Sequence, residues 1–149
     1  MNDPFAMRPF FGYNFGHYLK HWLSFQNKPG LSLPKIYHVN WFRKDDQGSF
    51  MWPGFGENSR VLDWIFRRTN GEDCAQKSAV GMVPTPGSIN LEGLTEKVDM
   101  EGLFSLPKEM WQQEVVDVRK YFDQQVAEDL PPEIMEELHN LEKRVDSML

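Results

Sequence analysis

The sequence contains a single cysteine, Cys74, which excludes an internal disulfide and fits a reducing compartment. It has no apolar run near the ~20 residues that a bilayer-spanning helix needs, and its first residues lack the basic start and apolar core of a secretory signal. Positive charge is also scarce, since 16 Lys and Arg stand against 22 Asp and Glu, for a net charge of −6. Such a surface repels nucleic acid and anionic membranes, so neither is expected as a partner.

Motifs for phosphate binding and for catalysis are missing as well. No segment matches the glycine-rich phosphate loop GxxxxGK[ST], and no serine or cysteine triad can be assembled. His17 with His21, and Glu136 with His139, have the spacing of metal ligands on a helix. The first pair lacks the adjacent glutamate of zinc proteases, and the second has no partner copy as in di-iron proteins. Solvated helix faces explain both pairs better, and Cys74 is expected to be an incidental thiol in a polar loop.

Aromatic residues, in contrast, make up 13% of the chain and gather in its first half. They begin at position 5, which suggests a piece of a longer protein. The organisation has three parts: residues 4–68 are rich in aromatic and apolar residues, 69–106 are looser, and 107–149 show two helical patterns. We find no internal repeat and no low-complexity tract.

Two helices are expected in the first part because apolar residues recur at helical spacing. One covers residues 14–25 and is capped by Asn14. The other runs from Asn58 to about Arg68 and ends before Gly71, a residue type that suits a helix end. The positions expected to face inward are Phe15, Leu19 and Trp22 or Leu23 in the first helix, and Val61, Leu62, Ile65 and Phe66 in the second.

Two more helices are expected after Pro107, which suits a helix start. They are separated at Leu130-Pro131-Pro132, because proline cannot continue the helical hydrogen bonds. Both should pack inward along one stripe and expose a charged face. The stripe consists of Trp111, Val115, Val118, Phe122 and Val126 in the first, and of Ile134, Leu138, Leu141 and Val145 in the second.

An aromatic hairpin is the most distinctive expectation. Residues 35–42 are typical of a strand, Asp45 to Gly48 of a type I turn, and Ser49 to Trp52 of a returning strand. This would bring Phe42 and Phe50 together, with Phe55 between two glycines close by. Such a cleft suits a planar heterocycle, and the carboxamide of Asn58 could read the edge of a base. From pattern alone, however, the rings are more often core and Asn58 is also a good helix cap.

Three sequence blocks then resemble a known family. PFAMRPFFGYNFGHYLKHWL (4–23), LPKIYHVNWFRKD (33–45) and WPGFGENSRVLDW (52–64) are similar, in order and spacing, to the C-terminal region of GTP-dependent phosphoenolpyruvate carboxykinases. LFSLPKEMW (103–111) and DLPPEI (129–134) resemble the family more loosely. The resemblance implies conversion of oxaloacetate and GTP to phosphoenolpyruvate, GDP and carbon dioxide, in gluconeogenesis.

The resemblance also implies a role for the aromatic loop. It implies that the guanine of GTP or GDP lies between Phe42 and Phe55, with Phe50 at its edge and Asn58 reading the base. It implies no catalytic residue in this chain. The family's phosphate loop, substrate-binding arginines and ligands for manganese or magnesium would lie upstream, outside it. The further loop residues that would shape the guanine pocket are Trp52, Pro53 and Gly54.

The expected fold is therefore α+β (mixed α/β), the C-terminal portion of the carboxykinase nucleotide-binding domain, with a hairpin and at least four helices. Residues 1–106 would form the guanine-binding portion and 107–149 a helical pair. The expected partners are a guanine nucleotide and the remainder of the parent enzyme, which would be a monomer of the cytoplasm or mitochondrial matrix. The alternatives are a non-catalytic scaffold whose aromatics are core and, less favoured by the acidic charge, a module that binds single-stranded RNA.

Overall fold

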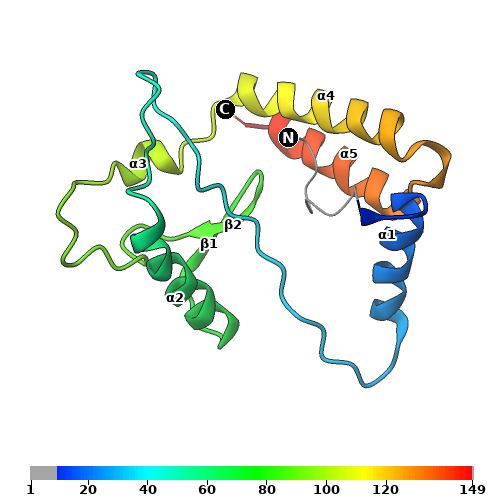
Figure 1. Ribbon diagram of the computed structural model, residues 1–149, viewed down its shortest axis with the longest axis horizontal. Coiled ribbons are helices and arrows are strands. Elements are labelled where there is room, and N and C mark those ends of the chain that lie inside the picture. The colour runs from blue at the N-terminus through cyan, green and yellow to red at the C-terminus, as the bar shows by residue number, and fades with distance from the viewer. Residues whose placement is uncertain (1–9, 149) are drawn as a thin grey trace. The chain divides into compact units, whose positions relative to one another are not determined.

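The computed structural model describes residues 10–148, so the start of the first sequence block, residues 4–9, lies outside it (Figure 1). The chain divides into two compact units. The terminal unit is formed by the two end segments, up to Pro34 and from Pro107 onward. The central unit is continuous and runs from Lys35 to Leu106.

The terminal unit is helical. Helix α1 (Phe15–Ser24) is followed by the short 3-10 helix η2 (Phe25–Asn27), and the C-terminal part contains α4 (Lys108–Gln125), η4 (Ala127–Asp129) and α5 (Pro132–Asp146). Helices α4 and α5 lie side by side (Figure 1). A cluster of Phe15, Leu19 and Val126 joins α1 to the turn after α4.

The expected cap of α1 is confirmed. The side-chain oxygen of Asn14 accepts a hydrogen bond from the Gly16 N–H at 2.7 Å, which satisfies one of the free donors at the helix start. The Asn14 amide also donates to the Val126 carbonyl at 3.1 Å. One side chain therefore caps α1 and ties it to the C-terminal segment.

The expected inward stripes of the two C-terminal helices are also confirmed. Val115, Val126, Leu138 and Val145 are buried, and the other predicted positions are half-buried. In α1, Leu23 rather than Trp22 is the half-buried alternative, since Trp22 is exposed. Helix α4 ends before the proline pair, and Pro132 begins α5 at a position where its missing N–H is harmless.

Gly16 permits a close approach between α1 and the turn before α5. A Cβ at this position would clash with the carbonyl oxygen of Asp129 and lie 2.6 Å from its carbonyl carbon. We expect Gly16→Ala to destabilise the terminal unit by about 1–3 kcal/mol, because backbone cannot move aside as a flexible side chain can. The better helix propensity of alanine offsets about 0.5–1 kcal/mol at most. Thermal unfolding followed by circular dichroism measures this effect, and Gly12→Ala is the control because nothing lies within 4 Å of its added Cβ. Equal melting temperatures for the two variants would contradict the close approach.

The central unit combines helix α2 (Asn58–Thr69), preceded by η3 (Phe55–Glu57), with a two-stranded antiparallel hairpin and the single-turn helix α3 (Met100–Leu103). Strands β1 (Ala75–Ser78) and β2 (Gly81–Pro84) pair from Ala75 opposite Pro84 to Ser78 opposite Gly81. The buried core of this unit consists of Trp52, Trp64, Cys74, Ala75 and Ile89.

The predicted strands of the aromatic hairpin are wrong. Residues 35–42 form no strand, and the return segment 49–52 contributes only an isolated bridge between Lys44 and Phe50. Tyr37 and Trp41 do pack against the core of the central unit. The strand-like pattern therefore reflects side chains that pack, while the backbone lacks the neighbouring strand that regular β-structure requires.

Three further expectations for the central unit need correction. Helix α2 buries Trp64, with Val61 and Ile65 partly covered, whereas Leu62 and Phe66 are 58% and 66% exposed. The large indole of Trp64 sets the inward face. The two exposed residues, two positions before and after Trp64, lie about 160° away from it, near the opposite face of the helix. Cys74 is buried in the core rather than exposed in a polar loop. The sequence does not predict the hairpin at residues 75–84, because its strands AQKS and GMVP lack the apolar–polar alternation typical of a half-buried strand.

The mixed α+β class is confirmed, with four longer helices, one single-turn helix and one hairpin in residues 10–148. No helix in this described part is long and apolar enough to cross a bilayer.

Candidate functional site

The aromatic loop is closed by a tight turn, as expected. The Gly48 N–H donates to the Asp45 carbonyl at 3.0 Å, and Gly48 has φ 81°, a left-handed value that glycine adopts without strain. The Asp45 carboxylate accepts from the N–H groups of Gln47 and Ser49, each at 2.9 Å. Backbone bonds from Asp45 N–H to Ser49 O and from Met51 N–H to Arg43 O, both 2.9 Å, extend this closure. The loop thus has hairpin geometry over a few residues without becoming a sheet.

The three phenylalanines assigned to the base all lie at the surface. Phe42, Phe50 and Phe55 are 73%, 58% and 93% exposed. The rings of Phe42 and Phe50 contact each other edge-to-face, with centroids 6.1 Å apart and planes at 61°. Phe42 sits diagonally from Phe50 across the Lys44–Phe50 bridge, the position at which aromatic side chains of paired segments meet. The structure therefore brings these two together and leaves their outer faces open.

A lysine completes this aromatic surface. The ammonium nitrogen of Lys44 lies 5.0 Å from the centroid of Phe50, within the range of a cation–π contact. The neighbouring Arg43 has a different role. Its guanidinium donates to the carbonyls of Leu103 and Ser105 at 2.8 and 2.9 Å. Arg43 thereby anchors the loop to the end of α3, while Lys44 remains beside the rings.

Trp52 and Asn58 are joined by a hydrogen bond beneath the loop. Trp52 is only 4% exposed, and its indole Nε1–H donates to Asn58 Oδ1 at 2.9 Å. Asn58 is the first residue of α2 and is half-buried. The expected use of Asn58 as a helix cap is wrong, because Glu57 occupies the cap position and no side chain makes the capping bond. The family resemblance places Trp52 in the pocket, but no sequence pattern predicts that its indole N–H contacts Asn58.

The bend between these residues depends on Gly54. Its φ of 115° and ψ of −169° lie in a region open essentially to glycine alone. Pro53 precedes it, and the Gly54 carbonyl accepts from the Glu57 N–H at 3.1 Å to start η3. Phe55, the first residue of η3, is directed to solvent. Gly54 thus sets the chain direction from buried Trp52 to exposed Phe55.

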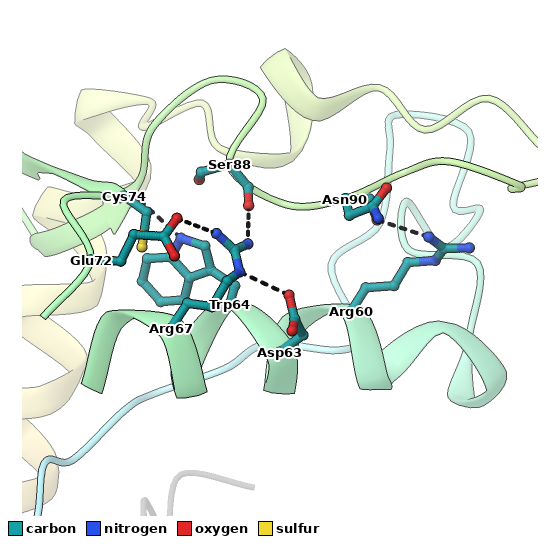
Figure 2. Close-up of polar contacts among 8 residues, drawn as sticks. All are labelled: Arg60, Asp63, Trp64, Arg67, Glu72, Cys74, Ser88 and Asn90. Atoms are coloured by element: carbon teal, nitrogen blue, oxygen red, sulfur yellow. Dashed lines mark hydrogen bonds and ion pairs between the residues drawn. The ribbon is translucent and has the colours of Figure 1, made fainter. Parts of the chain in front are cut away.

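The start of α2 is fixed by an arginine. Arg60 pairs with the Glu57 carboxylate at 2.6 Å. Its guanidinium also donates to the Asn90 carbonyl at 2.8 Å, a contact that Figure 2 shows. Since the carbonyl belongs to the segment that follows the β-hairpin, this contact holds the helix start against the rest of the central unit.

A second arginine cluster lies further along α2 (Figure 2). Arg67 pairs with Asp63 at 2.9 Å and with Glu72 at 2.5 Å, and it also donates to the Ser88 carbonyl. The hydrogen bond to Asp63, and next that to Glu72, raises the pKa of Arg67 above its ordinary value. These residues line a shallow polar hollow together with Gly87 and Asn90. The guanidinium of Arg67 is already paired with these protein acceptors.

The remaining candidates have structural partners. His17 contacts Asp129 at 3.2 Å, and His139 contacts Glu142 at 3.4 Å. Within residues 10–148 no three His, Cys, Asp or Glu side chains are grouped to hold a metal ion. The described residues therefore offer no set of side chains that fits a divalent metal ion.

The chain is similar to a known class of nucleotide-binding domain. Residues 1–144 match the family described as the phosphoenolpyruvate carboxykinase C-terminal P-loop domain, a nucleotide-binding class consistent with the mixed α+β fold. The chain belongs to the GTP-dependent phosphoenolpyruvate carboxykinase family, as the sequence blocks predicted.

Three curated relatives illustrate the similarity. The human "Phosphoenolpyruvate carboxykinase [GTP], mitochondrial" is 60% identical over 148 residues, covering 99% of this chain and 23% of the relative. The chicken "Phosphoenolpyruvate carboxykinase, cytosolic [GTP]" is 54% identical, with 99% and 24% covered. The Ascaris suum "Phosphoenolpyruvate carboxykinase [GTP]" is 46% identical, with 99% and 23% covered. The chain thus spans about a quarter of the length of these relatives.

Proposed function

We propose that this chain supplies the guanine-binding part of a GTP-dependent phosphoenolpyruvate carboxykinase, which converts oxaloacetate and GTP to phosphoenolpyruvate, GDP and carbon dioxide in gluconeogenesis. Phe42 and Phe55 stack on the two faces of the base, Phe50 contacts its edge, and Asn58 reads its polar groups. Residues 1–106 form the guanine-binding portion, and 107–149 form the accompanying helical pair.

The observation that carries the proposal is the exposure of three aromatic rings on a closed, well-anchored loop. Exposing apolar rings to water is unfavourable, so three of them on adjacent loop segments favour a surface that binds an apolar or planar partner. The competing scaffold explanation requires these phenylalanines to be core, and their exposure argues against it. In the same loop it is Trp52 that is core.

Stacking alone does not select a base, because every base has an aromatic face. Selection requires hydrogen bonds at the ring edge, and a group left unpaired by the wrong base disfavours it. Asn58 offers an amide donor and acceptor beside the aromatic loop, at the start of a helix fixed by Arg60. It is therefore the residue that supplies the preference for guanine over adenine.

The rest of the reaction depends on the rest of the parent enzyme. Binding of the phosphates, coordination of manganese or magnesium and decarboxylation use groups outside this chain, so the chain alone is not expected to catalyse. The named relatives include mitochondrial and cytosolic proteins, and the parent enzyme works, as a monomer, in one of these two compartments.

Asn58→Ala tests the function. We define the carrier enzyme as the full-length human mitochondrial relative with its matching segment replaced by this chain. In it, the variant should lower the ratio of kcat/KM for GTP to that for ATP about tenfold, the effect of losing roughly one hydrogen bond. Steady-state kinetics with both nucleotides measure the ratio. Asn70→Ala, at the other end of α2, serves as the control. An unchanged ratio in the Asn58 variant would remove the assignment.

A further inference from the structure

We propose that Trp52 is a positioning residue for nucleotide selection: its indole N–H locks the Asn58 carboxamide in the orientation that matches guanine and opposes adenine. This inference rests on the proposed function, in which Asn58 reads the base.

The lock follows from the chemistry of the indole. An indole N–H donates a hydrogen bond and accepts none, so the Asn58 atom 2.9 Å from Trp52 Nε1 must be the oxygen of the carboxamide. The amide NH₂ group then points to the opposite side. Rotating the carboxamide by half a turn would place NH₂ against the indole N–H, with two donors facing each other and no acceptor between them.

Trp52 holds this orientation because it cannot easily move. Its side chain is 4% exposed and belongs to the core cluster with Trp64 and Ile89. A buried N–H left without an acceptor is strongly disfavoured. Asn58, on the other side of the bond, is fixed at the first position of α2. The hydrogen bond therefore joins a rigid donor to the Asn58 side chain.

Guanine and adenine present opposite patterns at the edge used in base pairing. Guanine has an acceptor at O6 beside a donor at N1, whereas adenine has an amino donor beside an acceptor at N1. A free asparagine could match either base by rotating its amide. A locked Asn58 donates from NH₂ to O6 and accepts from N1–H with the second lone pair of Oδ1. With adenine, its donor and acceptor would face groups of the same kind.

The test replaces the donor and keeps the buried ring. In the carrier enzyme, Trp52→Phe should lower the GTP-to-ATP ratio of kcat/KM about tenfold, mainly by improving use of ATP, since the freed amide can rotate. Trp64→Phe is a matched control: Trp64 is 5% exposed and its Nε1–H also donates at 2.9 Å, but to the Cys74 carbonyl (Figure 2). This control should lower stability without changing the ratio.

A double-variant cycle separates positioning from packing. If Trp52 acts through Asn58, Trp52→Phe should produce no further loss of preference in the Asn58→Ala background. Should the phenylalanine variant fail to fold, β-(3-benzothienyl)alanine at position 52 keeps the indole shape, replaces N–H with sulfur and should give the same tenfold loss.

The possible kinetic results distinguish failure of the Trp52 proposal from failure of the proposed function. The proposal is overturned if either replacement at position 52 leaves the nucleotide ratio unchanged, if Trp64→Phe shifts it equally, or if the two losses add in the cycle. If Asn58→Ala alters the ratio while the replacements at position 52 do not, the lock fails and the guanine pocket stands. If Asn58→Ala also has no effect, the proposed function fails with it.

Discussion

Removing both stacking rings with Phe42→Ala and Phe55→Ala is expected to weaken GDP binding to the carrier enzyme about a hundredfold or more, because each base–aromatic contact contributes ~1–3 kcal/mol. The fold should hardly change. The two side chains are 73% and 93% exposed, so their truncation opens no cavity in the core. Isothermal titration with GDP measures the affinity, and thermal unfolding checks the fold.

The chain offers a matched control for this double variant. Phe10 and Phe66 are 79% and 66% exposed, and truncating both removes the same amount of aromatic side chain from residues that are not part of the loop. This control should bind GDP with unchanged affinity. If the loop variant binds within twofold of the unaltered protein, or if the control weakens binding equally, the rings do not form the base site.

Gly54→Ala is expected to have the second largest effect. The φ of 115° with ψ of −169° is disfavoured for any residue with a Cβ by about 1–3 kcal/mol or more, although open space surrounds the position. The chain would relax toward a permitted conformation and redirect Phe55, which follows directly. GDP binding should therefore weaken about 5- to 150-fold, the range that this strain corresponds to.

Gly56→Ala separates backbone strain from mere addition of a methyl group. Gly56 lies two residues further in the same loop, has no positive φ, and likewise has nothing within 4 Å of an added Cβ. It should bind GDP nearly normally, as titration calorimetry would show. Equal losses in both variants would mean that the ligand needs the space left by the two glycines rather than the conformation of one of them.

The helices were predictable because their signals are local. Asn14 precedes an apolar pattern and caps α1 as expected, and the stripe that includes Val115 and Val145 faces inward. Propensity, capping and apolar spacing all act within a few residues. The exposed faces of Leu62 and Phe66 show the limit of this reasoning, since the partner of a helix decides which apolar stripe is covered.

The strands were not predictable because pairing depends on residues far apart in sequence. KIYHVNWF has strand formers but no backbone partner, whereas AQKS and GMVP lack the pattern yet pair. The candidate site likewise has a part that could be predicted from the sequence and a part that could not. The resemblance named Phe42, Phe55 and Asn58. The bond from Trp52 to Asn58 was not predicted, because it depends on the exact course of the backbone through Gly54.

The terminal unit is built from two segments that are far apart in the sequence, whereas the central unit is one continuous segment. This difference has a consequence during protein synthesis. The partners of α1, around Val126, leave the ribosome only after the whole segment from Lys35 to Leu106 has been made. Until then the apolar face of α1, with Phe15 and Leu19, lacks the cover that Val126 gives it in the described structure, while the continuous unit can already complete its own core. Chains that are truncated after Leu106 and released from the ribosome should therefore protect Trp64 from proteases and leave α1 open to chaperone capture.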